Sequence, residues 1–115
     1  MPHIVVEYSS NLEEKVDVSS MLAAMHDALG AQGVDKARIK TRATAVNHSV
    51  VGNASANAGQ MVHITLLLLE GRDEATKQQY ANPIHAVTKE VVQKNFPECA
   101  VTLEVRDMAT ATYIL

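Results

Sequence analysis

The sequence predicts an α+β fold in which a β-α-β unit occurs twice in tandem. Short apolar runs alternate with longer amphipathic runs in the order strand, helix, strand, and this order then repeats. His3-Ile4 and His63-Ile64 open equivalent strands 60 positions apart. The 115 residues suffice for one core but not for two. We therefore expect a single domain over residues 1–115, with half-repeats at about 1–59 and 60–115, whose two helices lie on one face of a four-stranded sheet.

The first unit runs from a strand at His3–Tyr8 through a helix at about Asp17–Leu29 to a strand at about Ile39–Val46. Asp17 is a suitable N-cap, and Gly30 stands where the helix should end. Apolar residues recur at helical spacing within this helix and form one stripe that should face the core: Val18, Met21, Leu22, Met25, Ala28 and Leu29.

The second unit runs from a strand at Val62–Leu69 through a helix at about Asp73–Asn95 to a strand at Ala100–Asp107. Pro83 should kink or interrupt the helix. The segment Ile64–Leu69 is apolar on both faces of its strand, although one face suffices to cover the helices. In so small a chain, this pattern predicts that another subunit covers the second face.

Composition excludes several classes of partner. The formal charge of −3 and the aromatic content of 3% do not provide the basic, stacking surface that nucleic acids require. The longest apolar run is too short to span a membrane, and no leader pattern is present. Cys99 is the single cysteine, which fits a reducing compartment and a small buried side chain. We predict a cytoplasmic protein with neither a nucleic-acid nor a membrane partner.

Known chemical motifs are missing from the sequence. The five histidines show no ligand spacing such as i, i+4 on a helix, so we predict no metal site. Neither a Gly-x-Ser-x-Gly elbow nor a glycine-rich phosphate loop is present. We therefore expect no cofactor. The segment 47–60, rich in Gly, Ala, Ser and Asn, predicts a long loop between the two units.

Pro2 is the residue that points most directly to chemistry, because only Met1 precedes it and a strand follows at once. Initiator methionine is usually removed before a small residue, and proline qualifies. Removal would leave a secondary amine, whereas an internal proline nitrogen is an amide without an available lone pair. An α-amino group titrates near pH ~8, and burial or a nearby cation lowers this pKa toward neutrality. A base poised there suits general-base catalysis.

Three segments carry a resemblance to a known family: the opening Met-Pro-His-Ile-Val-Val-Glu-Tyr-Ser, the strand Val62-His63-Ile64-Thr65-Leu66, and Glu70-Gly71-Arg72. With the duplicated layout and the length, they resemble the 5-carboxymethyl-2-hydroxymuconate isomerase family of the tautomerase superfamily. The likeness covers most of the chain and thins after about Asp107. It implies a homotrimer with active sites at subunit interfaces, acting on a small-molecule carboxylate without a cofactor.

The resemblance also implies roles for particular residues. Pro2 would move a proton between carbons of a carboxylated 2-hydroxydienoate or unsaturated keto acid. Arg72 would grip a substrate carboxylate and stabilise the enolate oxygen, and its place before the second helix suits an anion. The second basic position falls on Lys40 or Arg42, which project from one face of their strand. Taken without the resemblance, these cations would be solvated surface charges.

Two other functions stay open at this point. The chain could be a trimeric, non-catalytic binding module of the same fold, which is what retention of Met1 would favour. It could also be a keto–enol tautomerase for a different substrate, such as a phenylpyruvate-type acid. The low aromatic content argues against a pocket for an aryl group.

Overall fold

The computed structural model describes residues 2–115. The predicted strands and helices are all present, within one or two residues of their predicted bounds. In chain order they are β1 (His3–Ser9), α1 (Val18–Gly30), β2 (Lys40–Val46), β3 (Met61–Leu69), α2 (Glu74–Gln93) and β4 (Ala100–Met108). Three short 3-10 turns complete the regular structure: η1 (Ser10–Glu14), η2 (Lys36–Arg38) and η3 (Thr110–Thr112). The predicted α+β class is therefore confirmed.

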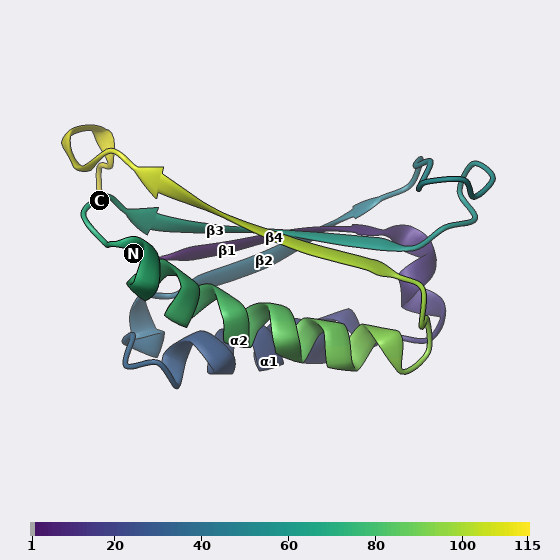
Figure 1. Cartoon of the computed structure of the whole chain (residues 1–115), viewed down its shortest axis with the longest axis horizontal. Helices are drawn as coiled ribbons and strands as arrows, with labels where there is room; N and C mark the ends of the chain where they lie inside the picture. Colours follow the sequence, from purple (N-terminus) through teal and green to yellow (C-terminus); the bar gives the residue numbers. More distant parts are fainter. Residues whose placement is uncertain (1) are drawn as a thin grey trace.

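The four strands form one mixed sheet in the order β2-β1-β3-β4. β1 is parallel to β2 and β3 is parallel to β4, as two β-α-β units require, while β1 and β3 pair in antiparallel fashion at the centre. Both helices lie on the same face of the sheet (Figure 1). The two units thus share one sheet, and one of its faces is left without helices.

The core lies between the sheet and the helices. Alternate residues of the two central strands are buried there: Ile4, Val6, Tyr8, Val62, Ile64, Leu66 and Leu68. From the predicted stripe of α1, Met21, Met25 and Leu29 are fully buried, and the other members lie half-buried at its margin. Burial of each such large side chain contributes about 1.5–3 kcal/mol to folding. The cap is as predicted, because an Asp17 carboxylate oxygen accepts from the Ser20 N–H at 3.4 Å.

Pro83 does not interrupt α2, which continues from Glu74 to Gln93. The expected interruption is therefore absent. Proline has no N–H to offer to the carbonyl of Gln79 one turn earlier, so the helix lacks one internal hydrogen bond. Buried side chains on both sides of the proline keep the two halves in one helix: Ala81, Ile84, Thr88 and Val92. Among residues 2–115, no helix is long and apolar enough to cross a membrane.

Candidate functional site

The register of the sheet determines where Pro2 lies. His3 pairs with Leu67 of antiparallel β3 and with Lys40 of parallel β2. The start of β1 therefore lies beside the end of β3 and beside the segment that precedes β2. The Pro2 carbonyl accepts a hydrogen bond from the Lys40 N–H at 3.1 Å, which fixes the residue in place. Pro2 is buried even though it stands at the beginning of the described chain.

A cavity of about 400 Å³ opens at this end of the sheet. Its lining comes from four separate segments and comprises Pro2, Gly33, Val34, Asp35, Arg38, Leu69, Arg72 and Tyr80. Both arginines are exposed, whereas Pro2 is buried. The volume is that of a small-ligand pocket. The structure thus places the predicted base and the first predicted cation, Arg72, in one cavity.

A tight turn after β3 positions Arg72. Gly71 has φ +110°, a conformation that residues with a Cβ rarely adopt. The Arg72 guanidinium then donates from Nη1 to the Leu69 carbonyl at 3.0 Å. The α2 N-terminus that follows is already capped, because an Asp73 carboxylate oxygen accepts from the Thr76 N–H at 2.8 Å. This hydrogen bond lowers the Asp73 pKa, so the anion at the helix N-terminus is the protein's own carboxylate.

Arg38 and Tyr80 line the cavity but were missed by sequence reasoning, and Arg38 is the second cation. Arg38 ends the short turn η2, and Ile39 alone separates it from the start of β2. Asp35 starts this turn: one carboxylate oxygen accepts from the Ala37 N–H at 3.0 Å, and the other lies 3.9 Å from Arg38 Nε. The signal available in the sequence was the position of Arg38 just before the strand that pairs in parallel with β1. Two guanidinium groups from different segments thus share the cavity with Pro2.

Lys40 and Arg42 do not line this cavity. They project from one face, as predicted, but it is the face away from the helices, where they pair with His3 and Val5 of β1. Lys40 Nζ donates to the carbonyl of Arg38 at 3.1 Å. Arg42 Nη1 donates to His3 Nδ1 at 2.9 Å. Within a single chain, neither side chain is brought to Pro2.

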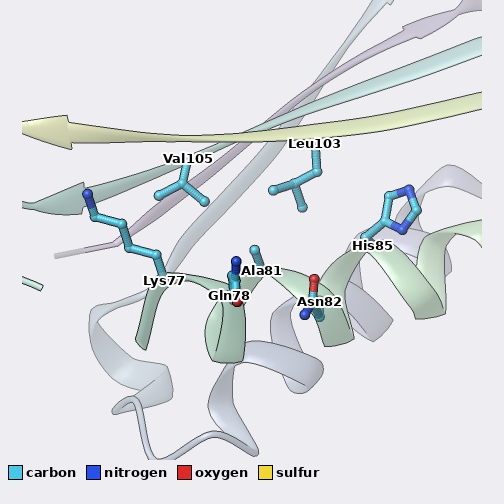
Figure 2. Close-up of a pocket in the computed structure, with 7 residues that line it drawn as sticks. All are labelled: Lys77, Gln78, Ala81, Asn82, His85, Leu103 and Val105. Carbon is cyan, nitrogen blue, oxygen red and sulfur yellow. The ribbon is translucent and has the colours of Figure 1, made fainter. Parts of the chain in front are cut away.

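A second cavity of about 310 Å³ lies between α2 and the edge strand β4 (Figure 2). Its lining residues are Lys77, Gln78, Ala81, Asn82, His85, Leu103 and Val105. Lys77 Nζ pairs with Asp107 at 3.0 Å, and His85 Nε2 donates to the Val101 carbonyl at 2.8 Å. Its two most basic side chains therefore have partners in the chain, and it shares no lining residue with the Pro2 cavity.

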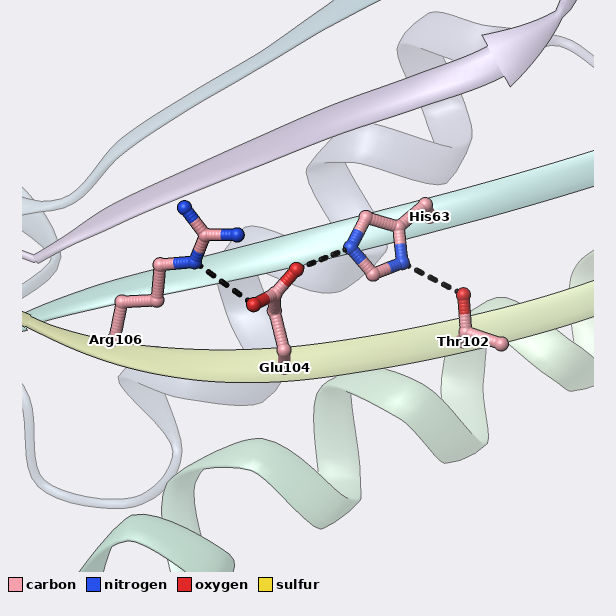
Figure 3. Close-up of polar contacts among 4 residues, drawn as sticks. All are labelled: His63, Thr102, Glu104 and Arg106. Carbon is pink, nitrogen blue, oxygen red and sulfur yellow. Dashed lines mark hydrogen bonds and ion pairs between the residues drawn. The ribbon is translucent and has the colours of Figure 1, made fainter.

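The sheet face without helices carries a polar network (Figure 3). His63 Nε2 lies 2.7 Å from a Glu104 carboxylate oxygen, and His63 Nδ1 lies 2.7 Å from the Thr102 hydroxyl. The other Glu104 oxygen accepts from Arg106 Nε at 2.8 Å. Hydrogen bonds from Arg106 and His63 lower the Glu104 pKa and keep this carboxylate ionised. None of the four residues lines the Pro2 cavity, so the network joins β3 to β4 outside the candidate site.

Several solved structures share the fold. A 5-carboxymethyl-2-hydroxymuconate delta-isomerase superposes with a TM-score of 0.78 at 18% identity, covering 100% of this chain and 86% of that one. A 5-carboxymethyl-2-hydroxymuconate isomerase from Deinococcus radiodurans R1 superposes with a TM-score of 0.79 at 21% identity, and the match covers 99% of this chain and 87% of that one. A fused 4-OT symmetric trimer superposes with a TM-score of 0.75 at 16% identity, and the match covers 98% of this chain and 92% of that one. No curated protein matches the chain.

These similarities, together with the four-stranded mixed sheet and its two helices, define a tautomerase-like fold. Residues 2–114 match the family of 5-carboxymethyl-2-hydroxymuconate isomerase, and the chain belongs to that family. The resemblance carried by the opening segment and by Glu70-Gly71-Arg72 is thereby confirmed. The chain is accordingly an isomerase.

Proposed function

We propose that this isomerase moves a proton between carbons of a carboxylated 2-hydroxydienoate of the 5-carboxymethyl-2-hydroxymuconate type, with Pro2 as the base. The observation that carries the proposal is the shared cavity of Pro2, Arg38 and Arg72, in a chain of this family. The proposal requires removal of Met1, which lies outside the described residues. The Pro2 nitrogen is then a secondary amine with a lone pair.

In the proposed reaction, the Pro2 lone pair takes a proton from the 2-hydroxyl group of the dienol or, in the keto form, from the carbon next to the carbonyl. The electrons of the broken bond then form a dienolate, with negative charge on the 2-oxygen and spread along the conjugated chain. The protonated amine returns the proton to a carbon of that chain, which gives the unsaturated keto acid. Because the proton leaves and re-enters one substrate, the step needs neither an oxidant nor a further reactant.

Arg72 and Arg38 are the proposed anion-binding residues. A guanidinium group binds a carboxylate through two parallel hydrogen bonds, and a prearranged cation also stabilises charge that develops on oxygen. We propose Arg38 as the second binding residue in place of Lys40 or Arg42, because Arg38 lines the cavity and the other two do not. The proposed substrate carries three carboxylates, and the two guanidinium groups can bind two of them.

We further propose that the chain assembles as a homotrimer. Support comes from the similar fold of the fused 4-OT symmetric trimer and from the sheet face that no helix covers. Thr65, Leu67 and Leu69 on this face are only half-buried in the single chain. Sedimentation should give the mass of three chains, and a monodisperse monomer would count against the assembly.

The proposed base is tested by an ultraviolet assay of 5-carboxymethyl-2-hydroxymuconate ketonisation, with protein whose amino terminus is confirmed by intact mass. Pro2-terminal protein should turn the substrate over, and protein that retains Met1 should not. Pro2→Ala should remove most activity, because a primary amine of different geometry and basicity replaces the ring nitrogen. Pro97→Ala is the matched control, since Pro97 is exposed and lies outside the cavity.

Equal turnover by wild type and Pro2→Ala would remove the proline from the mechanism. Absence of turnover by correctly processed wild type would instead reject 5-carboxymethyl-2-hydroxymuconate as the substrate. The remaining alternatives would be a tautomerase for another keto acid and a non-catalytic trimer. The family and the fold do not depend on either result.

A further inference from the structure

Tyr80 is the single aromatic residue among those that line the Pro2 cavity. It comes from α2 and is half-buried. Its ring belongs to the margin of the hydrophobic core, so the core holds it in place while part of it faces the cavity. A side chain anchored in this way presents a fixed surface to a molecule in the cavity.

The Tyr80 hydroxyl differs from the other tyrosine hydroxyls. The chain contains three tyrosines. Tyr8 donates to a Glu13 carboxylate at 2.9 Å, and the Tyr113 hydroxyl lies 2.8 Å from His3 Nε2. Within residues 2–115, the Tyr80 hydroxyl has no hydrogen-bond partner. A phenol that is partly covered usually has such a partner, so this group is available to a ligand in the cavity.

We propose that Tyr80 is a substrate-contacting residue that selects a planar, unsaturated 2-oxo or 2-hydroxy acid with at least two carboxylates. Its O–H donates a hydrogen bond to the 2-oxygen, and its ring, with Leu69 and Val34, forms the apolar wall for the conjugated carbon chain. This inference rests on the proposed function and deepens it, because it assigns the part of the substrate that lies between the two carboxylates.

The chemistry of the lining favours this class of substrate. Arg38 and Arg72 supply two guanidinium groups, which match two carboxylates. The carbon chain between two carboxylates needs an apolar surface, and a flat ring suits a flat conjugated chain. The 2-oxygen needs a donor, and a neutral phenol serves both the keto form and the more negative enolate. Its hydrogen bond strengthens as charge develops on that oxygen.

The test separates the hydroxyl from the ring. Tyr80→Phe removes the hydroxyl alone, and Tyr80→Leu also removes the aromatic wall. With 5-carboxymethyl-2-hydroxymuconate as substrate, Tyr80→Phe should lower kcat/KM about ten- to one-hundred-fold, the usual effect of losing a hydrogen bond to a charged group. Tyr80→Leu should lower it further. Tyr8→Phe is the matched control. It removes a hydroxyl that donates to Glu13 and not to the cavity, so the variant should keep the kcat/KM of wild type.

A binding measurement separates this inference from the proposed reaction. Calorimetry with 2-oxoadipate, a saturated 2-oxo dicarboxylate, should show weaker binding to Tyr80→Phe and unchanged binding to Tyr8→Phe, whose hydroxyl contacts Glu13 outside the cavity. If wild type is inactive but Tyr80→Phe still weakens 2-oxoadipate binding, the contact stands and the proposed reaction falls. If Tyr80→Phe binds 2-oxoadipate as wild type does and keeps its kcat/KM, the inference is overturned, whether or not the protein turns over.

Discussion

Arg42 Nη1 donates a hydrogen bond to His3 Nδ1 across 2.9 Å, on the sheet face away from the helices. Because Nδ1 accepts, the proton of the neutral ring is on Nε2, which donates to the Tyr113 hydroxyl at 2.8 Å. The two rings also meet edge to face, with their centroids 5.9 Å apart. Arg42 therefore belongs to a chain of three side chains that ties the C-terminal segment to β1.

This placement predicts different effects for two arginines that stand close together in the sequence. Arg38→Gln should raise KM and lower kcat/KM by about ten- to one-hundred-fold, because a charged hydrogen-bond donor leaves the cavity. Arg42→Gln should leave kcat/KM within a few-fold of wild type, because Arg42 does not line the cavity of its own chain. Steady-state kinetics on 5-carboxymethyl-2-hydroxymuconate compares the two variants directly.

Each change removes one exposed guanidinium group from the same stretch of chain, so each variant is the control for the other. The reverse pattern, with Arg42→Gln impaired and Arg38→Gln normal, would show that the second anion-binding residue reaches the site from a neighbouring subunit. It would also restore the sequence-based choice of Lys40 or Arg42.

His3 makes the folding stability depend on pH. Burial, and then the charge of Arg42, lower the His3 pKa below its ordinary value of 6.5. The unfolded chain therefore takes up a proton at His3 at a higher pH than the folded chain does. Stability should fall as the pH drops below 6.5 and continue to fall until the lower folded pKa is passed. Above that window the ring is neutral in both states and contributes no slope.

Urea unfolding between about pH 7 and pH 5 measures this slope. His3→Gln should flatten the profile, because the titrating group is gone. His48→Gln should not, because His48 is exposed in the loop between the two units. A profile for His3→Gln that remains as steep as that of wild type would assign the acid sensitivity to groups other than His3.

The sequence predicted the fold well because its strongest signals are local and periodic. Alternation in β4 and the apolar stripe of α1 depend only on neighbouring residues, and each follows directly from strand or helix geometry. The consequence of Pro83 was harder to predict. A proline signals a local break, but burial of Ala81 and Ile84 on either side of it is a tertiary effect that outweighs the lost hydrogen bond.

The candidate site was predictable only in part. Pro2 and Arg72 carry local signals, namely a proline after the initiator residue and an arginine between a glycine turn and a helix. Tyr80 carries no such local signal, and the position of Arg38 before β2 becomes informative only once β2 is known to pair in parallel with β1. Their meeting with Pro2 depends on strand register and on how α2 packs. Strand alternation predicts that Lys40 and Arg42 lie on one face of the sheet, but it does not say which face. In the structure they pair with the β1 residues that alternate with buried Ile4 and Val6, so they lie on the face away from the helices.

Gly71→Ala should impair substrate binding through Arg72. The position has φ +110°, so alanine there is strained by about 1–3 kcal/mol, although no atom lies within 4 Å of the added Cβ. The turn can relieve this strain only by moving, and Arg72 moves with it. We expect a lower unfolding free energy together with a several-fold higher KM, measured by urea unfolding and by steady-state kinetics.

Gly52→Ala is the matched control for this turn. Gly52 also has positive φ and open space around it, but it lies in the loop between the two units and not in the cavity. It should lower stability without changing KM. Equal KM values for Gly71→Ala and wild type would separate the turn from substrate binding.

Pro83→Ala should stabilise the protein. Alanine restores the missing N–H in α2 and removes the clash of the ring with the preceding turn, together worth up to about 3 kcal/mol. The greater freedom of alanine in the unfolded chain offsets about 0.4–1 kcal/mol of this gain. Urea unfolding should therefore show a net increase of about 1–2 kcal/mol. Pro97→Ala, in an exposed turn outside the helix, should show no gain.

The activity of Pro83→Ala carries further information, because Tyr80 lies one turn before the proline in the same helix. A variant that is more stable and equally active would show that packing on the sheet alone positions Tyr80. A variant that is more stable but less active would show that the proline bends the first half of α2 toward the cavity. No gain in stability would mean that the helix already accommodates the ring at no cost, which would contradict the prediction.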